Sequence, residues 1–169
     1  MSFTLKTAGG NEVVNRNTMS VSDFNKPELL ESEWLEKVFP FGGTRMKEWI
    51  FDGIRMVYSD WHFQKPVELE WESNWGTVRL YFNLKGAVSI DNSPGQIQLL
   101  GNRQQNMFYG SDRKGIFKTD DLQMQAFRLH FTREAFLRIA GEGSDNLKAF
   151  ADKVAGQKTS ILSVDALPL

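Results

Sequence analysis

Residues 123–139 read Gln-Met-Gln-Ala-Phe-Arg-Leu-His-Phe-Thr-Arg-Glu-Ala-Phe-Leu-Arg-Ile. The first half alternates between two sets of side chains, which is typical of a half-buried strand. Phe127, Leu129 and Phe131 form one set, and Ala126, Arg128 and His130 form the other. At Thr132 the periodicity changes, because Thr132 is a good helix N-cap and apolar residues then recur at helical spacing. This stretch therefore predicts a strand that continues into a helix without a loop.

Upstream of this junction, short apolar segments alternate with turn residues back to about Met46. Asp52-Gly53 is a hairpin turn dipeptide, and residues 67–72 alternate strictly between apolar side chains and glutamates. In the next segment we expect one set of side chains to face inward, Val78, Leu80, Phe82 and Leu84, and the other to face outward, Arg79, Tyr81 and Asn83. Eight or nine strands spaced by roughly eight to twelve residues predict an antiparallel sandwich or barrel.

The two ends of the chain have other patterns. Residues 3–15 predict a short hairpin, and residues 25–39 predict a helix capped by Asn25, with Leu30, Trp34 and Val38 as its apolar stripe. Downstream, Ser144 is expected to cap a second C-terminal helix that Gly156 ends. The predicted organisation is an N-terminal arm at 1–45, a β-barrel at 46–131, association helices at 132–156 and a linker at 157–169.

Composition excludes several classes of function. The 169 residues carry 20 Lys and Arg against 21 Asp and Glu, for a net charge of −1. A nucleic-acid surface needs clustered excess base, so we do not expect this chain to have such a surface of its own. The chain has no cysteine, and it has no run of about 20 apolar residues that could span a bilayer. We expect a cytoplasmic protein without membrane contact.

Residues suited to catalysis or metal binding are scarce. The two histidines, His62 and His130, are far apart in the sequence, so a site with three or four converging ligands is not expected. His130 is expected at the barrel surface or against a helix, and the alternative is that either histidine forms a hydrogen bond to a ligand. The strict alternation of Glu68, Glu70 and Glu72 predicts a solvated strand face rather than paired acid and base carboxylates. No nucleophile or phosphate-binding motif occurs, and we expect neither a cofactor nor enzymatic activity.

Aromatic side chains suggest a binding cavity. They could line a pocket for an apolar or ring-containing ligand, with an arginine anchoring its polar group. The alternative is that they simply fill the core. The candidate effector-binding residues are Tyr58, Trp71, Trp75, Phe82 and Tyr109, with Arg79 and Arg128 as anchors.

Four segments together resemble a known family. Residues 46–56, 78–86, 106–109 and 129–139 are similar to the N-terminal regulatory region of AraC-type transcriptional regulators, in the branch common in Bacteroidetes. The resemblance implies a cupin-like β-barrel of jelly-roll type that senses a small molecule, followed by helices for dimerisation. It also implies a C-terminal pair of helix-turn-helix units that binds DNA, which cannot be fitted before Leu169.

The predicted function is therefore the ligand-sensing and dimerisation domain of such a regulator. Two alternatives stay open: a metal-free cupin enzyme such as a sugar isomerase or epimerase, and a binding protein without regulatory output. The sequence leaves open the effector and whether the protein activates or represses. The resemblance implies a homodimer through two apolar stripes, which could instead pack on the barrel of the same chain: Phe136, Ile139 and Ala140, and Leu147, Phe150 and Val154.

Overall fold

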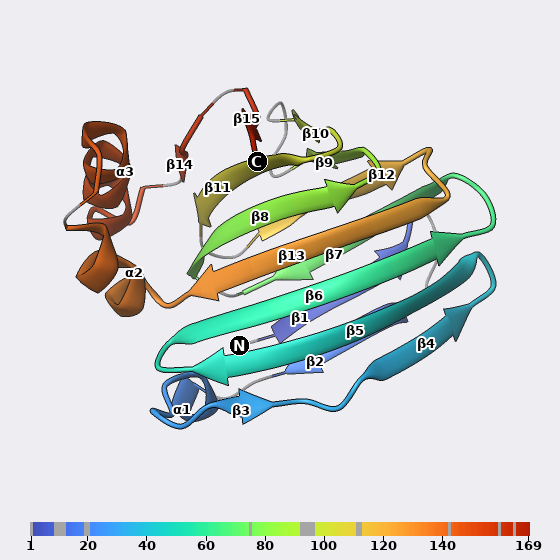
Figure 1. Ribbon diagram of the computed structural model, residues 1–169, viewed down its shortest axis with the longest axis horizontal. Coiled ribbons are helices and arrows are strands. Elements are labelled where there is room, and N and C mark those ends of the chain that lie inside the picture. The colour runs from blue at the N-terminus through green and yellow to red at the C-terminus, as the bar shows by residue number, and fades with distance from the viewer. Residues whose placement is uncertain are drawn as a thin grey trace.

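Two antiparallel sheets packed face to face make up most of the molecule (Figure 1). The computed structural model describes residues 2–8, 13–18, 21–74, 76–91, 97–110, 113–141, 143–158, 160–163 and 165–169. The smaller sheet has the order β10 (Ile97–Leu100), β9 (Val88–Asp91), β12 (Arg113–Thr119), β7 (Val67–Ser73), β1 (Ser2–Thr7) and β2 (Val13–Thr18).

The larger sheet carries most of the strands that follow residue 42. Its order is β14 (Ser160–Ile161), β11 (Gln104–Gly110), β8 (Thr77–Lys85), β13 (Gln123–Phe131), β6 (Ile54–Phe63), β5 (Gly42–Phe51) and β3 (Leu30–Glu31). Two more short strands join it, β4 (Leu35–Phe39) beside β5 and β15 (Leu167–Pro168) beside β11. With the helices α2 (Arg133–Ala140) and α3 (Asp145–Ala155) at one end, this is the predicted fold class, a mainly antiparallel β-structure followed by a helical pair.

The strand-to-helix junction is confirmed. β13 ends at Phe131 and α2 begins at Arg133, with Thr132 as its N-cap. The Thr132 hydroxyl accepts a hydrogen bond from the Ala135 N–H at 3.1 Å, which satisfies one of the unpaired donors of the first turn. Ser144 caps α3 in the same way, as predicted, and Gly156 lies at its C-terminal end.

The turn between β5 and β6 touches this junction. Asp52 and Gly53 both have positive φ, 47° and 79°, as a tight hairpin turn with this twist requires. The Gly53 carbonyl accepts a hydrogen bond from the Thr132 N–H at 2.8 Å, and its N–H donates to the Phe24 carbonyl of the short helix α1 (Val21–Phe24) at 2.9 Å. Arg138 of α2 binds the Asp52 carboxylate at 2.7 Å. Three segments distant in sequence therefore meet at this turn.

Apolar side chains form two clusters, one on each side of the larger sheet. The first lies between the sheets and includes Leu69 and Trp71 from the smaller sheet and Trp61 and Met124 from the larger. The second joins the outer side of the larger sheet to α2 and α3. Strands β8, β11 and β13 are thus covered on both sides near the helices.

The predicted helix at residues 25–39 is wrong. Strands β3 and β4 occupy much of this segment, and both pair with β5. The stripe that predicted a helix stays at the surface, since Leu30, Trp34 and Val38 are 36%, 41% and 91% exposed. Pairing five residues of β4 with Gly42–Met46 satisfies the backbone groups of β5, and this tertiary gain overrides local helical periodicity. The predicted hairpin at 3–15 is seen as the pair β1 and β2; residues 9–12 lie outside the described part of the chain.

The predicted orientation of residues 78–84 is also wrong. Arg79 and Tyr81 face the space between the sheets, and Asn83 is fully buried, with its side-chain N–H groups donating to the carbonyls of Leu100 and Gly101. Val78 instead faces the helices, in the second apolar cluster. Alternation identifies the two faces of a strand, but where both faces are covered it does not say which one looks inward.

Candidate functional site

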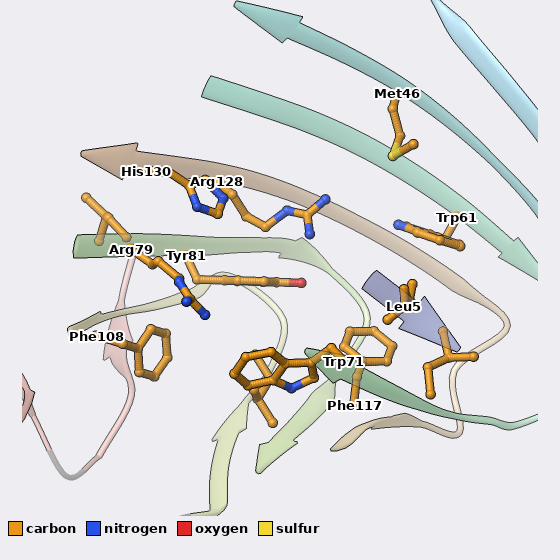
Figure 2. Close-up of a pocket in the computed structure, with 13 residues that line it drawn as sticks. Leu5, Met46, Trp61, Trp71, Arg79, Tyr81, Phe108, Phe117, Arg128 and His130 are labelled. Atoms are coloured by element: carbon orange, nitrogen blue, oxygen red, sulfur yellow. The ribbon is translucent and has the colours of Figure 1, made fainter. Parts of the chain in front are cut away.

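A cavity of about 120 Å³ lies between the two sheets (Figure 2). Side chains from both sheets surround it. Its lining is mostly apolar and aromatic, but it includes the side chains of Arg79, Arg128 and His130. The lining residues are Leu5, Met46, Trp61, Leu69, Trp71, Arg79, Leu80, Tyr81, Ile90, Phe108, Phe117, Arg128 and His130. A concave, largely apolar space with a few convergent polar groups is the usual form of a small-molecule site.

The polar side of the cavity comes from two adjacent strands. Residues at alternate positions of a strand share a face, so Arg128 and His130 project together from β13, and Arg79 and Tyr81 project together from β8. The two pairs lie side by side, because Arg128 is opposite Tyr81 and His130 is opposite Arg79 in the register of the strands. Figure 2 shows these side chains above Trp71 of the smaller sheet.

Each guanidinium in the cavity contacts a ring and a hydroxyl. Arg79 lies 5.4 Å from the centre of the Trp71 ring and donates to Ser73 Oγ at 3.4 Å. Arg128 lies 5.9 Å from the centre of the Tyr81 ring and donates from Nη2 to Ser59 Oγ at 3.3 Å. Both ring contacts are within the range of a cation–π attraction, which favours a positive charge over the face of the ring.

Burial and mutual repulsion set the charge states of the site. Burial lowers the pKa of the Arg128 guanidinium, while Tyr81 opposes this shift; an arginine nevertheless stays protonated. The pKa of His130 is held well below its usual value by burial first and then by the charges of Arg55, Arg79 and Arg128. Burial raises the pKa of the Tyr81 hydroxyl. At neutral pH the site therefore combines two cations with a neutral imidazole and a neutral phenol.

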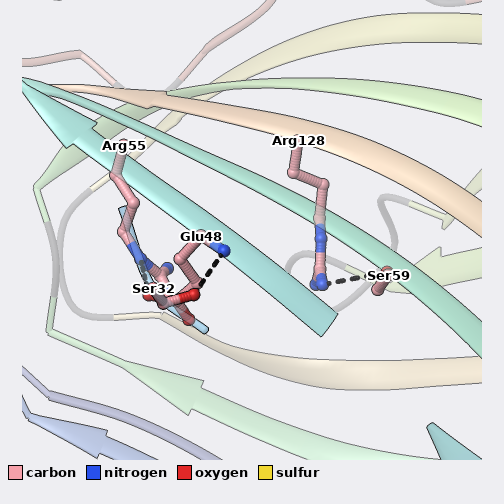
Figure 3. Close-up of polar contacts among 5 residues, drawn as sticks. All are labelled: Ser32, Glu48, Arg55, Ser59 and Arg128. Carbon is pink, nitrogen blue, oxygen red and sulfur yellow. Dashed lines mark hydrogen bonds and ion pairs between the residues drawn. The ribbon is translucent and has the colours of Figure 1, made fainter. Parts of the chain in front are cut away.

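A second buried arginine lies nearby but has a different partner (Figure 3). Arg55 of β6 binds Glu48 of β5 through two contacts, Nη2 to Oε1 at 2.6 Å and Nε to Oε2 at 3.2 Å. This is the two-point geometry in which a guanidinium and a carboxylate bind most strongly. Figure 3 shows Arg128 reaching Ser59 instead.

Only part of the predicted binding set lines this cavity. Trp71, Arg79 and Arg128 come together there. Tyr58 and Phe82 lie on the opposite face of the larger sheet, where Tyr58 contacts Trp34 and Phe82 contacts Phe127. Tyr109 is buried in the cluster beneath the helices. Trp75 lies outside the described residues. The prediction that Tyr58, Phe82 and Tyr109 share a cavity with the two arginines is therefore corrected.

Tyr81 and His130 also line the cavity, although neither is in the predicted binding set. Both could have been found, because each lies two positions from a predicted arginine on the same strand and so shares its face. His130 was expected at the barrel surface or against a helix, with contact to a ligand as the alternative, and the structure places it inside the sandwich.

Most residues of the predicted dimer stripes pack within their own chain. Phe136, Ala140, Phe150 and Val154 are at most 2% exposed in the cluster that joins the helices to the larger sheet. The alternative of packing on the same chain is therefore observed for these four. Leu147 packs against the same cluster and is partly buried, while Ile139 is 52% exposed.

The described residues also bear on three other features: the glutamates of β7, metal-ligating groups and membrane-spanning helices. Glu68, Glu70 and Glu72 are exposed on β7, as predicted for a solvated face. Within the described ranges, no group of three or more metal-ligating side chains is close enough to hold an ion. None of the helices in the described part has the length and apolar character needed to cross a membrane.

Comparisons with known proteins give similarity in fold only. No family model and no curated protein matches the chain. Among solved structures, it is similar to the AraC-like transcriptional activator CuxR, with 11% identity and a TM-score of 0.44 over 68% of this chain and 45% of that chain. It is also similar to a cupin superfamily protein from Desulfitobacterium hafniense, with 13% identity and a TM-score of 0.39 over 63% of this chain and 80% of the other.

A third similar structure corrects one expectation. It comes from a study of DMSP lyases, with 13% identity and a TM-score of 0.42 over 60% of this chain and 50% of that chain. The inference that the chain is not an enzyme is therefore wrong, because enzymes are among the proteins it is similar to. None of these similarities assigns an activity, and this chain spans less than half of the CuxR chain.

Proposed function

We propose that this chain is a small-molecule-sensing domain of an AraC-like transcriptional regulator, with the cavity between the sheets as the effector site. The observation that carries the proposal is the position of β13. This strand contributes Arg128 and His130 to the cavity and continues through Thr132 into α2 without a loop. A ligand that displaces β13 also displaces the start of a helix.

The packing around the junction supports such a coupling. α2 and α3 rest on the outer side of the strands whose inner side lines the cavity. The β5–β6 turn holds the other side of the junction through Gly53 and Asp52. A shift of β13 that exceeds what these contacts tolerate changes the balance between two arrangements of α2, and a ligand with different affinity for the two selects one of them.

The output of the domain belongs to the same proposal. In it, α2 passes the change to a second copy of the chain and to a DNA-binding domain outside these residues. Four of the six stripe residues are buried in cis, so the association surface would be built from exposed positions such as Ile139. Replacement of Ile139 by Asp would then lower the mass measured by analytical ultracentrifugation, and an unchanged mass contradicts this part of the proposal.

The test is hydrogen exchange on the chain with and without a bound small molecule. A thermal-shift screen of sugars, single-ring acids, their amides and the matching amines finds binders, since a ligand of the folded state raises its stability. With a binder present, the amides of residues 133–140 are expected to change their exchange rates. Binding that protects only the strands around the cavity, or no binder in the panel, contradicts the proposed function.

A further inference from the structure

The lining of the cavity has a one-sided charge. Arg79 and Arg128 both reach it, and none of its described lining residues is an aspartate or a glutamate. His130 adds no negative charge, and Tyr81 is kept protonated by burial. A space of this kind repels cations, and a positive charge that lacks a counterion is costly where water is scarce.

Arg128 is the cation whose hydrogen bonding is least complete. The hydrogen bond that it donates to the Ser59 hydroxyl is long, at 3.3 Å. Its Nε is buried and has no hydrogen-bond partner among the described residues, and none of their carboxylates lies within ion-pair distance of it. The nearby carboxylate of Glu48 is already engaged at both oxygens by Arg55. Arg55 therefore forms a two-point contact with a carboxylate, and Arg128 forms none with a described residue.

The opposite wall offers a second donor and an apolar surface. Trp71 Nε1 is buried and likewise has no hydrogen-bond partner in the described part of the chain. Around it lie apolar and aromatic side chains, among them Leu5, Ile90 and Phe117. A ligand with acceptor oxygens at one end could bind the unpartnered donors, and its apolar body could pack against the apolar side chains.

Size and charge narrow the class of occupant. The volume of about 120 Å³ is of the same order as that of a cavity of about 150 Å³ that takes up benzene. A nucleotide or a disaccharide is too large for such a space. A dianion such as a phosphate ester brings a second charge into a mostly apolar lining, which raises the desolvation cost without a second unpaired guanidinium to offset it.

We propose that the cavity binds a small organic carboxylate, no bulkier than about one six-membered ring, with its carboxylate on Arg128 and its apolar body against Trp71. This inference rests on the proposed function in one respect, since it takes the same cavity as the effector site. The carboxylate would supply the partner that Arg128 lacks and could accept from the Trp71 N–H. Charge-assisted hydrogen bonds of this kind are the stronger ones in proteins.

The test is isothermal titration calorimetry at pH 7 with matched probes. Benzoate, cyclohexanecarboxylate and hexanoate represent the proposed class. Benzamide has the shape of benzoate without its charge, benzylamine carries the opposite charge, and inorganic phosphate is an anion without an apolar body. At least one carboxylate is expected to bind, with benzamide at least tenfold weaker and with benzylamine and phosphate not detected.

Variants locate the binding. Arg128→Gln is expected to weaken the carboxylate about 10- to 100-fold, and Arg128→Lys to recover part of the loss because it keeps the charge but not the two-point geometry. The matched control is the double variant Arg55→Gln with Glu48→Gln, which removes a neighbouring pair and should leave affinity within about twofold. Near-ultraviolet circular dichroism confirms that each variant is folded.

Each outcome decides between the two proposals. Equal affinity for benzamide, preference for phosphate, no binding by any carboxylate, or an unchanged affinity in Arg128→Gln overturns the assigned ligand class. A neutral or larger compound that binds and changes exchange in residues 133–140 then still supports the sensing function. Arg128-dependent carboxylate binding without any change in those residues supports the ligand class and contradicts the sensing function.

Discussion

Arg55 and Arg128 project from neighbouring strands to the same side of the larger sheet. Among the described residues, only Arg55 forms an ion pair with a carboxylate. Arg128 is opposite Val57 in the register of β6 and β13, which lies two positions from Arg55. Arg55 forms a two-point ion pair with Glu48, whereas Arg128 donates to Ser59. The difference teaches that two neighbouring buried arginines can be satisfied differently: Arg55 is neutralised within the fold, whereas Arg128 is the one to which the proposed carboxylate would bind.

The largest effect is expected from breaking the completed pair. Arg55→Met leaves Glu48 partly buried without its cation, and loss of one partner of a buried pair costs about 3–5 kcal/mol in the free energy of unfolding. Urea denaturation followed by tryptophan fluorescence measures this change. The double variant Arg55→Met with Glu48→Met removes both charges and should recover most of the loss. A single variant as stable as the wild type would mean that the pair contributes little to stability. The proposed difference between Arg55 and Arg128 would then be wrong.

Acidification measures the effect of burial, and then of the charges of Arg55, Arg79 and Arg128, on His130. His130 has a folded pKa well below its unfolded value of about 6.5. Below that pH the unfolded chain binds a proton that the folded chain does not, so the free energy of unfolding falls as pH decreases. The slope from this residue approaches about 1.4 kcal/mol per pH unit between the two pKa values and vanishes well above pH 7.

The matched control for this pH dependence is the other histidine. His130→Gln should flatten the decline between pH 6.5 and about 5, whereas His62→Gln, at an exposed position, should leave it in place. Chemical denaturation at half-unit pH steps resolves the difference. Equal slopes in the wild type and in His130→Gln would show that the imidazole gains its proton in the folded state as easily as in the unfolded chain.

The same substitution at Arg128 should have the opposite sign. Arg128→Met replaces a charge that lacks a carboxylate with an apolar side chain of similar length, so the unliganded chain is expected to gain about 1 kcal/mol. Thermal and urea unfolding without ligand, beside Arg55→Met, give the direct contrast. A loss as large as that of Arg55→Met would indicate that Arg128 is neutralised within the fold.

The smallest effect is expected at the hydroxyl that Arg128 contacts. Ser59→Ala removes a hydrogen bond of 3.3 Å, and the expected loss is at most about 1 kcal/mol. The same urea denaturation measures this loss. A loss of several kcal/mol would mean that Ser59 stabilises Arg128 as strongly as Glu48 stabilises Arg55. In that case the two arginines would be equally well satisfied, and the argument for an anionic occupant would lose its basis.

The sequence was a good guide where local chemistry decides structure. Asp52-Gly53 takes the positive φ values of a tight turn, Thr132 caps a helix, and the glutamates of β7 alternate with buried residues. In each case the side chain's own conformational or solvation preference points to one outcome. The β-rich fold with a helical pair followed from these features.

The site was harder to predict because its geometry depends on packing between distant segments. Once α2 and α3 cover the outer side of the larger sheet, residues such as Val78 are buried there and the polar set turns inward. Residues 30–38 likewise have helical spacing of apolar residues, but much of this segment pairs with strand β5 instead of forming a helix. Arg79, Arg128 and Trp71 were identified as candidates, but a single sequence could not place Tyr58, Phe82 and Tyr109 away from them.

The turn at Asp52 and Gly53 also bears on the order in which the molecule assembles. Its hairpin joins strands adjacent in sequence, whereas its ion pair to Arg138 spans 86 residues. On the ribosome the hairpin therefore emerges long before the helix that docks on it, and closing the longer loop costs more chain entropy. Pulse-labelling exchange during refolding should find the Thr132 amide protected later than those of β5 and β6, and simultaneous protection would contradict this order. The start of α2 would then be one of the last parts of the chain to become fixed.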